Sequence, residues 1–140
     1  MQFTSKLCYT FYVDINGGIC LRILVIIPAY NEEASIGAVI TRIRLCVPEA
    51  DIIVINDGSS DNTSSKAQDA GAIVIDLPFN LGIGGAMQTG YKYAVQNNYD
   101  IAVQVDGDGQ HDPSYIKSLI QPVVKNHADM AIGSRFVSKT

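Results

Sequence analysis

Short apolar runs alternate with polar or amphipathic stretches from Leu21 to the end of the chain. Most of these runs are continuous rather than alternating, which is typical of strands buried on both faces. Strands are expected at residues 23–27, 52–55, 72–75, 101–105 and 128–132. Each run ends in proline, glycine or short polar residues, which favour turns.

Helices are expected between these strands. They are predicted from Asn31-Glu32-Glu33 to about Cys46, from the Ser60-Asp61 cap to about Ala70, from the end of a glycine-rich loop at 78–85 through Tyr93 to about Gln96, and from near Pro113. Tyr91 and Tyr93 are expected to pack the third helix against the sheet. This alternation indicates an α/β fold with a Rossmann-like, mostly parallel sheet flanked by helices.

Residues 1–20 lack a clear period before Gly17-Gly18. Three interpretations stay open: a short β-hairpin, a disordered tail, or translated sequence upstream of the true start. The regular pattern begins at Leu21, so the domain is expected to comprise residues 21–140.

Composition and charge narrow the class of protein. Hydrophobic residues make up 47% and charged residues 17% of the chain, as expected of a globular protein. The formal net charge is −4 and no basic patch stands out, which argues against nucleic-acid binding. Anionic ligands would have to be bound locally, by a metal ion, an arginine or backbone N–H groups.

Cysteine usage and hydropathy suggest a location. Cys8, Cys20 and Cys46 are an odd number without a C-x-x-C pair, so neither a disulfide framework nor a zinc site is expected. No apolar run approaches the roughly 20 residues of a membrane span. We expect a cytoplasmic protein.

Polar residues follow the predicted strands. They are Tyr30-Asn31-Glu32 after the first strand, Asp57 after the second, Asp106-Gly107-Asp108 after the fourth and Arg135 after the fifth. In open parallel sheets, ligands bind beyond the carboxyl ends of the strands. These residues are therefore expected along one edge of the sheet.

The segment D-G-D-G-Q places two carboxylates and an amide at alternate positions. Asp106, Asp108 and Gln110 can converge on one hard cation, and Mg²⁺ or Mn²⁺ prefers such oxygen ligands. The alternative is a turn with solvated side chains. A calcium loop of the EF-hand type is rejected, because its twelfth position would be Lys117 instead of glutamate. His111 is expected to contact the substrate or the metal ligands rather than to bind the metal ion itself.

Three further signals are weaker. Asp57 can accept a hydrogen bond from a nucleobase or a ribose, or can simply form an Asx turn. The glycine-rich segment N-L-G-I-G-G-A carries Met87 where a dinucleotide fingerprint needs its last glycine, and no P-loop is present. The guanidinium of Arg135 can bind phosphate in a bidentate manner.

Four segments and a closing motif together resemble one family. They are I-I-P-A-Y-N-E-E, V-I-N-D-G-S-S-D-N-T, L-G-I-G-G-A, Q-V-D-G-D-G-Q-H-D-P and G-S-R-F. Their order and spacing are similar to those of family 2 glycosyltransferases of the GT-A fold, nearest to dolichyl-phosphate mannose or glucose synthases and bacterial polyprenyl-phosphate relatives. The resemblance covers about residues 21–140.

The resemblance implies roles for individual residues. Nucleotide-sugar binding is implied for Pro28, Ala29, Tyr30, Glu32, Ile55, Asp57, Asp106, Gly107, Asp108 and Gln110. Metal binding is implied for Asp106, Asp108 and Gln110, with Mg²⁺ or Mn²⁺ as cofactor. Catalytic roles are implied for Asp108 and for Arg135, which would bind phosphate.

The implied activity is metal-dependent, inverting transfer of a sugar from a UDP- or GDP-sugar to a polyprenyl or dolichyl phosphate or a glycan acceptor. Family members usually continue beyond the G-S-R motif, so we expect a donor-binding part truncated at the C-terminus. One alternative is a nucleotide-sugar-binding fragment without activity. Another is a nucleotidyltransferase, but that class usually has a basic residue in the loop after its first strand, and P-A-Y-N-E-E has none.

Overall fold

The computed structural model describes residues 21–134. Its elements, in chain order, are β1 (Ile23–Ala29), α1 (Ile36–Cys46), β2 (Asp51–Asn56), α2 (Thr63–Asp69), β3 (Ile73–Asp76), α3 (Gly82–Gln96), β4 (Ile101–Gln104), the 3-10 helix η1 (Pro113–Tyr115) and α4 (Ile116–Val124). The predictions for residues 1–20, for Arg135 and for the end of the G-S-R-F motif lie outside the described residues.

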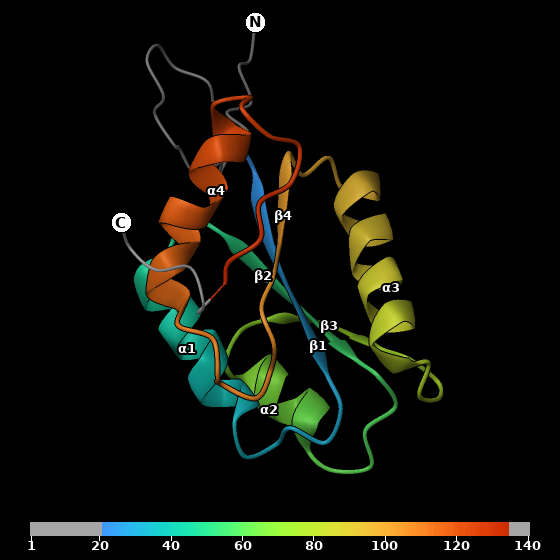
Figure 1. Cartoon of the computed structure of the whole chain (residues 1–140). Helices are drawn as coiled ribbons and strands as arrows, with labels where there is room; N and C mark the ends of the chain where they lie inside the picture. Colours follow the sequence, from blue (N-terminus) through green and yellow to red (C-terminus); the bar gives the residue numbers. More distant parts are fainter. Residues whose placement is uncertain (1–20, 135–140) are drawn as a thin grey trace, which may run out of the picture.

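The four strands form one parallel sheet in the order β3-β2-β1-β4. Helix α3 covers one face, and α1, α2 and α4 cover the other (Figure 1). The predicted Rossmann-like α/β fold is confirmed. Strand β1 lies between β2 and β4 and is parallel to both. The loops after β1 and β4 therefore lie next to each other.

The central strand β1 supplies core to both faces. Ile23, Val25 and Ile27 pack against the helices of one face, while Leu24 and Ile26 pack beneath α3. All five side chains are at most 2% exposed. A continuous apolar run is needed here because both sides of the strand are covered.

Helix α1 begins later than the acidic residues suggested. Asn31 has a left-handed φ of 53°, and its backbone N–H donates to Ser59 instead of entering a helix. The helix starts only at Ile36. Glu32 and Glu33 therefore belong to the β1–α1 loop, because tertiary hydrogen bonds outcompete local helix formation there.

Helix α3 begins earlier than expected. The glycine-rich residues 82–85, predicted as loop, form its first turn. The N–H of Leu81 donates to Asp57 Oδ1 at 2.7 Å, and that of Gly82 donates to Asn80 Oδ1 at 2.9 Å. These carboxylate and amide oxygens satisfy N–H groups at the helix start that would otherwise lack partners, which offsets the low helix propensity of glycine.

Two further expectations were wrong. Residues 128–132 form no strand, and Met130 and Ile132 are largely exposed, because β4 pairs only with β1 among the described strands. Apolar residues adopt strand structure only where a partner completes the ladder. Tyr93 does pack from α3 against the core on that face of the sheet, but Tyr91 is 47% exposed.

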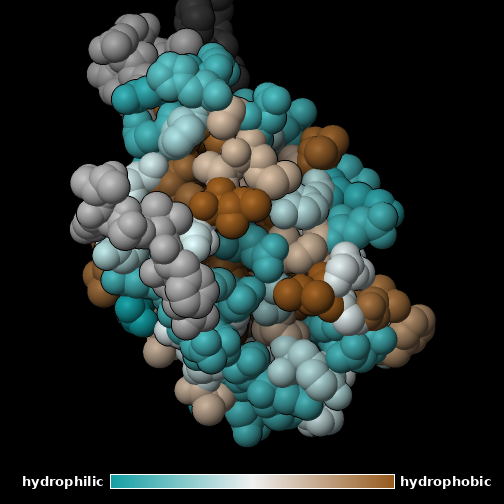
Figure 2. Space-filling model, in the orientation of Figure 1, coloured by the Kyte–Doolittle hydropathy of each residue, from teal (hydrophilic) through white to brown (hydrophobic). Residues whose placement is uncertain are grey.

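No helix between residues 21 and 134 combines the length and apolar character that a membrane span requires. Figure 2 shows exposed hydrophobic side chains as separate brown areas within a mostly hydrophilic face. Cys46, the cysteine within the described residues, is a half-buried free thiol.

Candidate functional site

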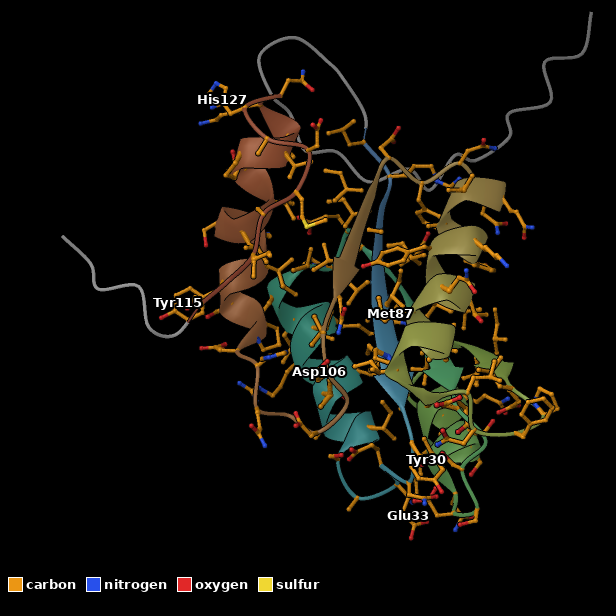
Figure 3. All side chains as sticks on the ribbon, turned by 45° about the vertical axis from the view of Figure 1, so that its right-hand side comes forward. Tyr30, Glu33, Met87, Asp106, Tyr115 and His127 are labelled. Atoms are coloured by element: carbon orange, nitrogen blue, oxygen red, sulfur yellow. The ribbon has the colours of Figure 1, made fainter. Side chains whose placement is uncertain are left out.

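A pocket of about 210 Å³ lies at the carboxyl ends of the strands. Its walls come from the end of β1, from the residues that follow β1, β2 and β4, and from the first two turns of α3. They are Pro28, Ala29, Tyr30, Glu32, Asp57, Ile83, Ala86, Asp106, Gly107 and Asp108. Figure 3 shows Tyr30 and Asp106 in the lower half of the molecule, with His127 at the opposite end.

The structure therefore brings together most of the residues singled out in the sequence. Ile83 and Ala86 were missed, since the glycine-rich segment that carries them was read as a loop with no assigned role. Ile55 does not line the pocket, because its side chain is fully buried against α3. Asp57, two residues further along the chain, lies just beyond the end of β2 and lines the pocket.

Asp57 is held rigidly in the wall of the pocket. It is only 4% exposed, and its Oδ1 accepts the Leu81 N–H. Gly58 makes this contact possible: it has a φ of 72°, and a Cβ there would lie 2.7 Å from the backbone nitrogen of Asn80. The β3–α3 loop thus packs directly over Asp57, which leaves the second carboxylate oxygen to a ligand.

The β1–α1 and β2–α2 loops are joined by hydrogen bonds. The Asn31 and Glu32 N–H groups donate to Ser59 Oγ and Thr63 Oγ1, at 2.9 and 2.8 Å. The Glu33 N–H donates to Asp61, whose carboxylate also accepts from Thr63. Although desolvation opposes it, these hydrogen bonds hold the pKa of Asp61 below its usual value.

The loop after β4 presents its two carboxylates differently. Asp106 is half-buried and lies 3.8 Å from His111 Nε2, with Gln104 Nε2 3.2 Å from its Oδ1. Asp108 is exposed, and its Oδ1 accepts the Gln110 N–H at 2.9 Å, while Gly109 adopts a φ of 79°. This is a tight Asp-Gly turn, stabilised by a hydrogen bond within the turn.

This donor set fits a divalent cation only in part. No group of three histidine, cysteine or acidic side chains within residues 21–134 is arranged to enclose a metal ion. Asp106 and Asp108 nevertheless line the same pocket, where phosphate oxygens of a ligand can complete the coordination of Mg²⁺ or Mn²⁺. The exposed Gln110 is not among the lining residues, so its predicted metal contact remains a prediction.

The pocket is strongly acidic. Glu32, Asp57, Asp106 and Asp108 contribute four carboxylates, and none of the lining residues is basic. A phosphorylated ligand placed here would be repelled unless a cation came with it. The described part of the site could therefore accept a phosphorylated ligand only together with a cation or with basic groups from elsewhere.

An open parallel sheet with a polar pocket beyond its carboxyl edge is the architecture of nucleotide-binding α/β proteins. Residues 24–140 match the model of glycosyl transferase family 2, and the chain belongs to this family. The match favours the glycosyltransferase prediction over the nucleotidyltransferase alternative. The boundary at residue 21 stays a prediction.

Curated relatives include enzymes that act on lipid phosphates. The chain is 37% identical over 122 residues to the undecaprenyl-phosphate mannosyltransferase of Micrococcus luteus, covering 84% of this chain and 49% of the relative. It is 36% identical over 130 residues to the UDP-N-acetylglucosamine–dolichyl-phosphate N-acetylglucosaminyltransferase of Methanococcus voltae, covering 81% and 51%. The chain spans about half the length of these relatives.

Solved structures agree with the fold. The glucosyl-3-phosphoglycerate synthase of Mycobacterium tuberculosis, in complex with Mn²⁺ and UDP-glucose, superposes with a TM-score of 0.61 at 32% identity. The superposition covers 74% of this chain and 39% of that one. The similarity includes the GT-A sheet whose edge carries the pocket described above.

Proposed function

We propose that this chain is the donor-binding portion of an inverting, metal-dependent glycosyltransferase. The donor is a UDP- or GDP-sugar, and the acceptor is a polyprenyl or dolichyl phosphate. The observation that carries the proposal is the convergence of Asp57, from the loop after β2, and of Asp106 and Asp108, from the loop after β4, on one pocket at the carboxyl edge of the sheet.

The nucleoside would occupy the wall formed by the loops after β1 and β2. Asp57 has one carboxylate oxygen engaged by Leu81, so the other can accept from a base N–H or a ribose hydroxyl. Tyr30 and Ile83 offer exposed apolar surface at the same pocket. A flat base between such side chains would bury apolar area while Asp57 fixes its orientation.

The diphosphate would lie toward Asp106 and Asp108. What the cation supplies when bound is Lewis-acid stabilisation of the charge that develops on the departing diphosphate. Asp106 and Asp108 would hold it, and Asp106 is kept in place by Gln104 and His111. From the family resemblance, we also propose that Arg135 binds a phosphate group.

Transfer would be a single displacement. An acceptor phosphate oxygen attacks the anomeric carbon from the face opposite the diphosphate; the C–O bond to the diphosphate breaks and its electron pair leaves with the nucleotide. The configuration at carbon inverts. A phosphate acceptor is already ionised at neutral pH, so the step needs no strong general base.

The lipid-phosphate acceptor is supported by the names of the relatives in Micrococcus luteus and Methanococcus voltae. A substrate of that kind would bring the protein to the cytoplasmic face of a membrane. We propose this contact as peripheral.

Calorimetric titration of UDP-glucose and GDP-mannose, each with and without Mn²⁺, tests the proposal. We expect one donor to bind only with Mn²⁺, and Asp108→Ala to weaken that binding at least tenfold, since it removes one of two carboxylate ligands. Asp69→Ala on the exposed surface of α2 is the matched control, because it removes the same charge away from the pocket. If a folded chain binds neither donor, or Asp108→Ala binds as well as the wild type, the proposal is wrong.

A further inference from the structure

Ser35 occupies the N-cap position of α1, but its side chain makes no capping hydrogen bond. Serine is favoured at this position because its hydroxyl oxygen usually accepts an N–H from the first helical turn. Here the hydroxyl points elsewhere. The side chain therefore forgoes the local interaction that its position offers.

The Ser35 hydroxyl contacts the site instead. Its Oγ lies 2.8 Å from the carbonyl oxygen of Gly107 and 2.7 Å from Glu32 Oε2. Gly107 stands between Asp106 and Asp108, and it is separated from Ser35 by 72 residues along the chain. Since a hydroxyl has one hydrogen, the carbonyl and the carboxylate share a single donor.

The contact connects the β1–α1 side of the pocket with the turn after β4, whose side chains otherwise form hydrogen bonds within their own segment. The other hydrogen bonds of Asp106 and Asp108 are made with Gln104, Gln110 and His111, all within the same segment. Glu32, in contrast, donates its N–H to Oγ1 of Thr63, the first residue of α2. Ser35 thus links the wall that holds Glu32 to the turn that carries the two aspartates.

The position of Gly107 shows why such a link matters. The Cβ that an alanine would place at Gly107 would lie in ordinary contact with the carbonyl oxygen of Pro28, 3.4 Å away. The turn thus lies close to the end of β1, and van der Waals contact of this kind has no preferred direction. A hydrogen bond to the Gly107 carbonyl fixes its direction as well.

We propose that Ser35 is a positioning residue of the donor site: its hydroxyl anchors the Asp106–Asp108 turn against the nucleotide wall. The substrate side of this inference rests on the proposed function, whereas the anchoring does not. Loss of one hydrogen bond of this kind is expected to weaken Mn²⁺-dependent donor binding about five- to tenfold.

The test compares three variants of the full 140-residue chain. Ser35→Ala removes the hydroxyl, and Ser35→Thr retains it and should restore binding to near the wild-type level. Ser118→Ala is the matched control, because that hydroxyl also donates to a backbone carbonyl near the start of a helix, Tyr115 O at 2.8 Å, but away from the pocket. Thermal unfolding of each variant shows whether the fold is kept.

Two readouts are measured. Calorimetry gives the affinity for the donor in the presence of Mn²⁺ and, without metal, for the free nucleoside, which carries no phosphate charge. Amide hydrogen exchange by NMR, on the metal-free chain, reports the mobility of Gly109 and Gln110. In Ser35→Ala we expect the metal-dependent affinity to fall, the metal-free affinity to stay unchanged, and the exchange of these two amides to accelerate severalfold.

The readouts separate the two ideas. If the wild type binds no donor but Ser35→Ala still accelerates exchange at Gly109 and Gln110, the proposed function is wrong and the anchoring stands. Unchanged exchange and unchanged donor affinity in Ser35→Ala would overturn the anchoring while leaving the proposed function intact. A loss of binding that Ser35→Thr does not restore would also count against the hydroxyl.

Discussion

At the scale of single residues, Gly90 marks a close approach of helix α3 to the sheet. The residue is buried, and a Cβ at this position would collide with Cγ2 of Ile26, which is fully buried in β1. No side chain larger than a hydrogen fits between helix and strand here. The sequence shows only a glycine in the middle of a helical pattern, which by itself is unfavourable by about 1 kcal/mol relative to alanine.

Gly90→Ala is therefore expected to destabilise the protein by about 1–2 kcal/mol. Overpacking of a core costs about 1–3 kcal/mol, and the gain in helix propensity offsets up to about 1 kcal/mol of it. Chemical denaturation measures the difference. Gly84→Ala in the same helix meets no atom within 4 Å and should be neutral or stabilising. Equal behaviour of the two variants would contradict the close approach.

At the scale of elements, an aromatic cluster lies at the end of the sheet opposite the pocket and connects α3 with the start of β2. The Tyr99 ring stacks on Tyr93 of α3 with centroids 6.3 Å apart, and the guanidinium of Arg22 lies 4.3 Å from its centroid. The Tyr99 hydroxyl donates to Asp51 Oδ2 at 2.7 Å. Burial, followed by this hydrogen bond and the charge of Asp51, raises the pKa of Tyr99 well above its usual 10.0.

The raised pKa predicts a loss of stability in alkali. Below pH 10 both folded and unfolded chains keep Tyr99 neutral; above it the unfolded chain ionises first, so the free energy of unfolding falls as pH rises. Tyr99→Phe should cost about 1 kcal/mol or less near neutral pH and should flatten the alkaline profile. Tyr115→Phe, which alters a largely exposed ring, should keep the wild-type profile. Identical alkaline profiles for the wild type and Tyr99→Phe would show that the pKa of Tyr99 is the same in the folded and the unfolded chain.

Elements also show where prediction from sequence succeeds. The runs at 23–27 and 52–55 were correctly predicted as strands, because a strand covered on both faces needs uninterrupted apolar residues. The start of α3 was misplaced, because the carboxylate that accepts the Leu81 N–H at this helix start belongs to Asp57, in another loop. Such a cap leaves no signal in the local sequence.

At the scale of the whole molecule, the acidic pocket and the independent core lead to a prediction about ligands. The apolar clusters on the two faces of the sheet contain neither Asp106 nor Asp108. Removal of divalent cations with EDTA should therefore leave the melting temperature nearly unchanged. Mn²⁺ with the matching nucleoside diphosphate at about 100 times its Kd should stabilise the fold by about 2.7 kcal/mol.

That stabilisation corresponds to a rise in melting temperature of roughly 10 °C for a domain of this size. Scanning calorimetry with each addition separately provides the control. The nucleotide alone should have little effect, because four carboxylates line its pocket and no lining residue is basic. An equal rise with nucleotide alone would show that the pocket does not depend on a metal ion.

The sequence by itself determined the class of fold and the chemistry at the strand ends. Apolar runs with this spacing can be buried only in a parallel sheet covered on both faces, and such a sheet brings Asp57, Asp106 and Asp108 to one edge. Tertiary structure alone decided the rest: that Ile83 joins the pocket, that Ile55 does not, and that Ser35 reaches Gly107. These outcomes depend on contacts between segments distant in the chain, whose geometry exists only once the layers have packed.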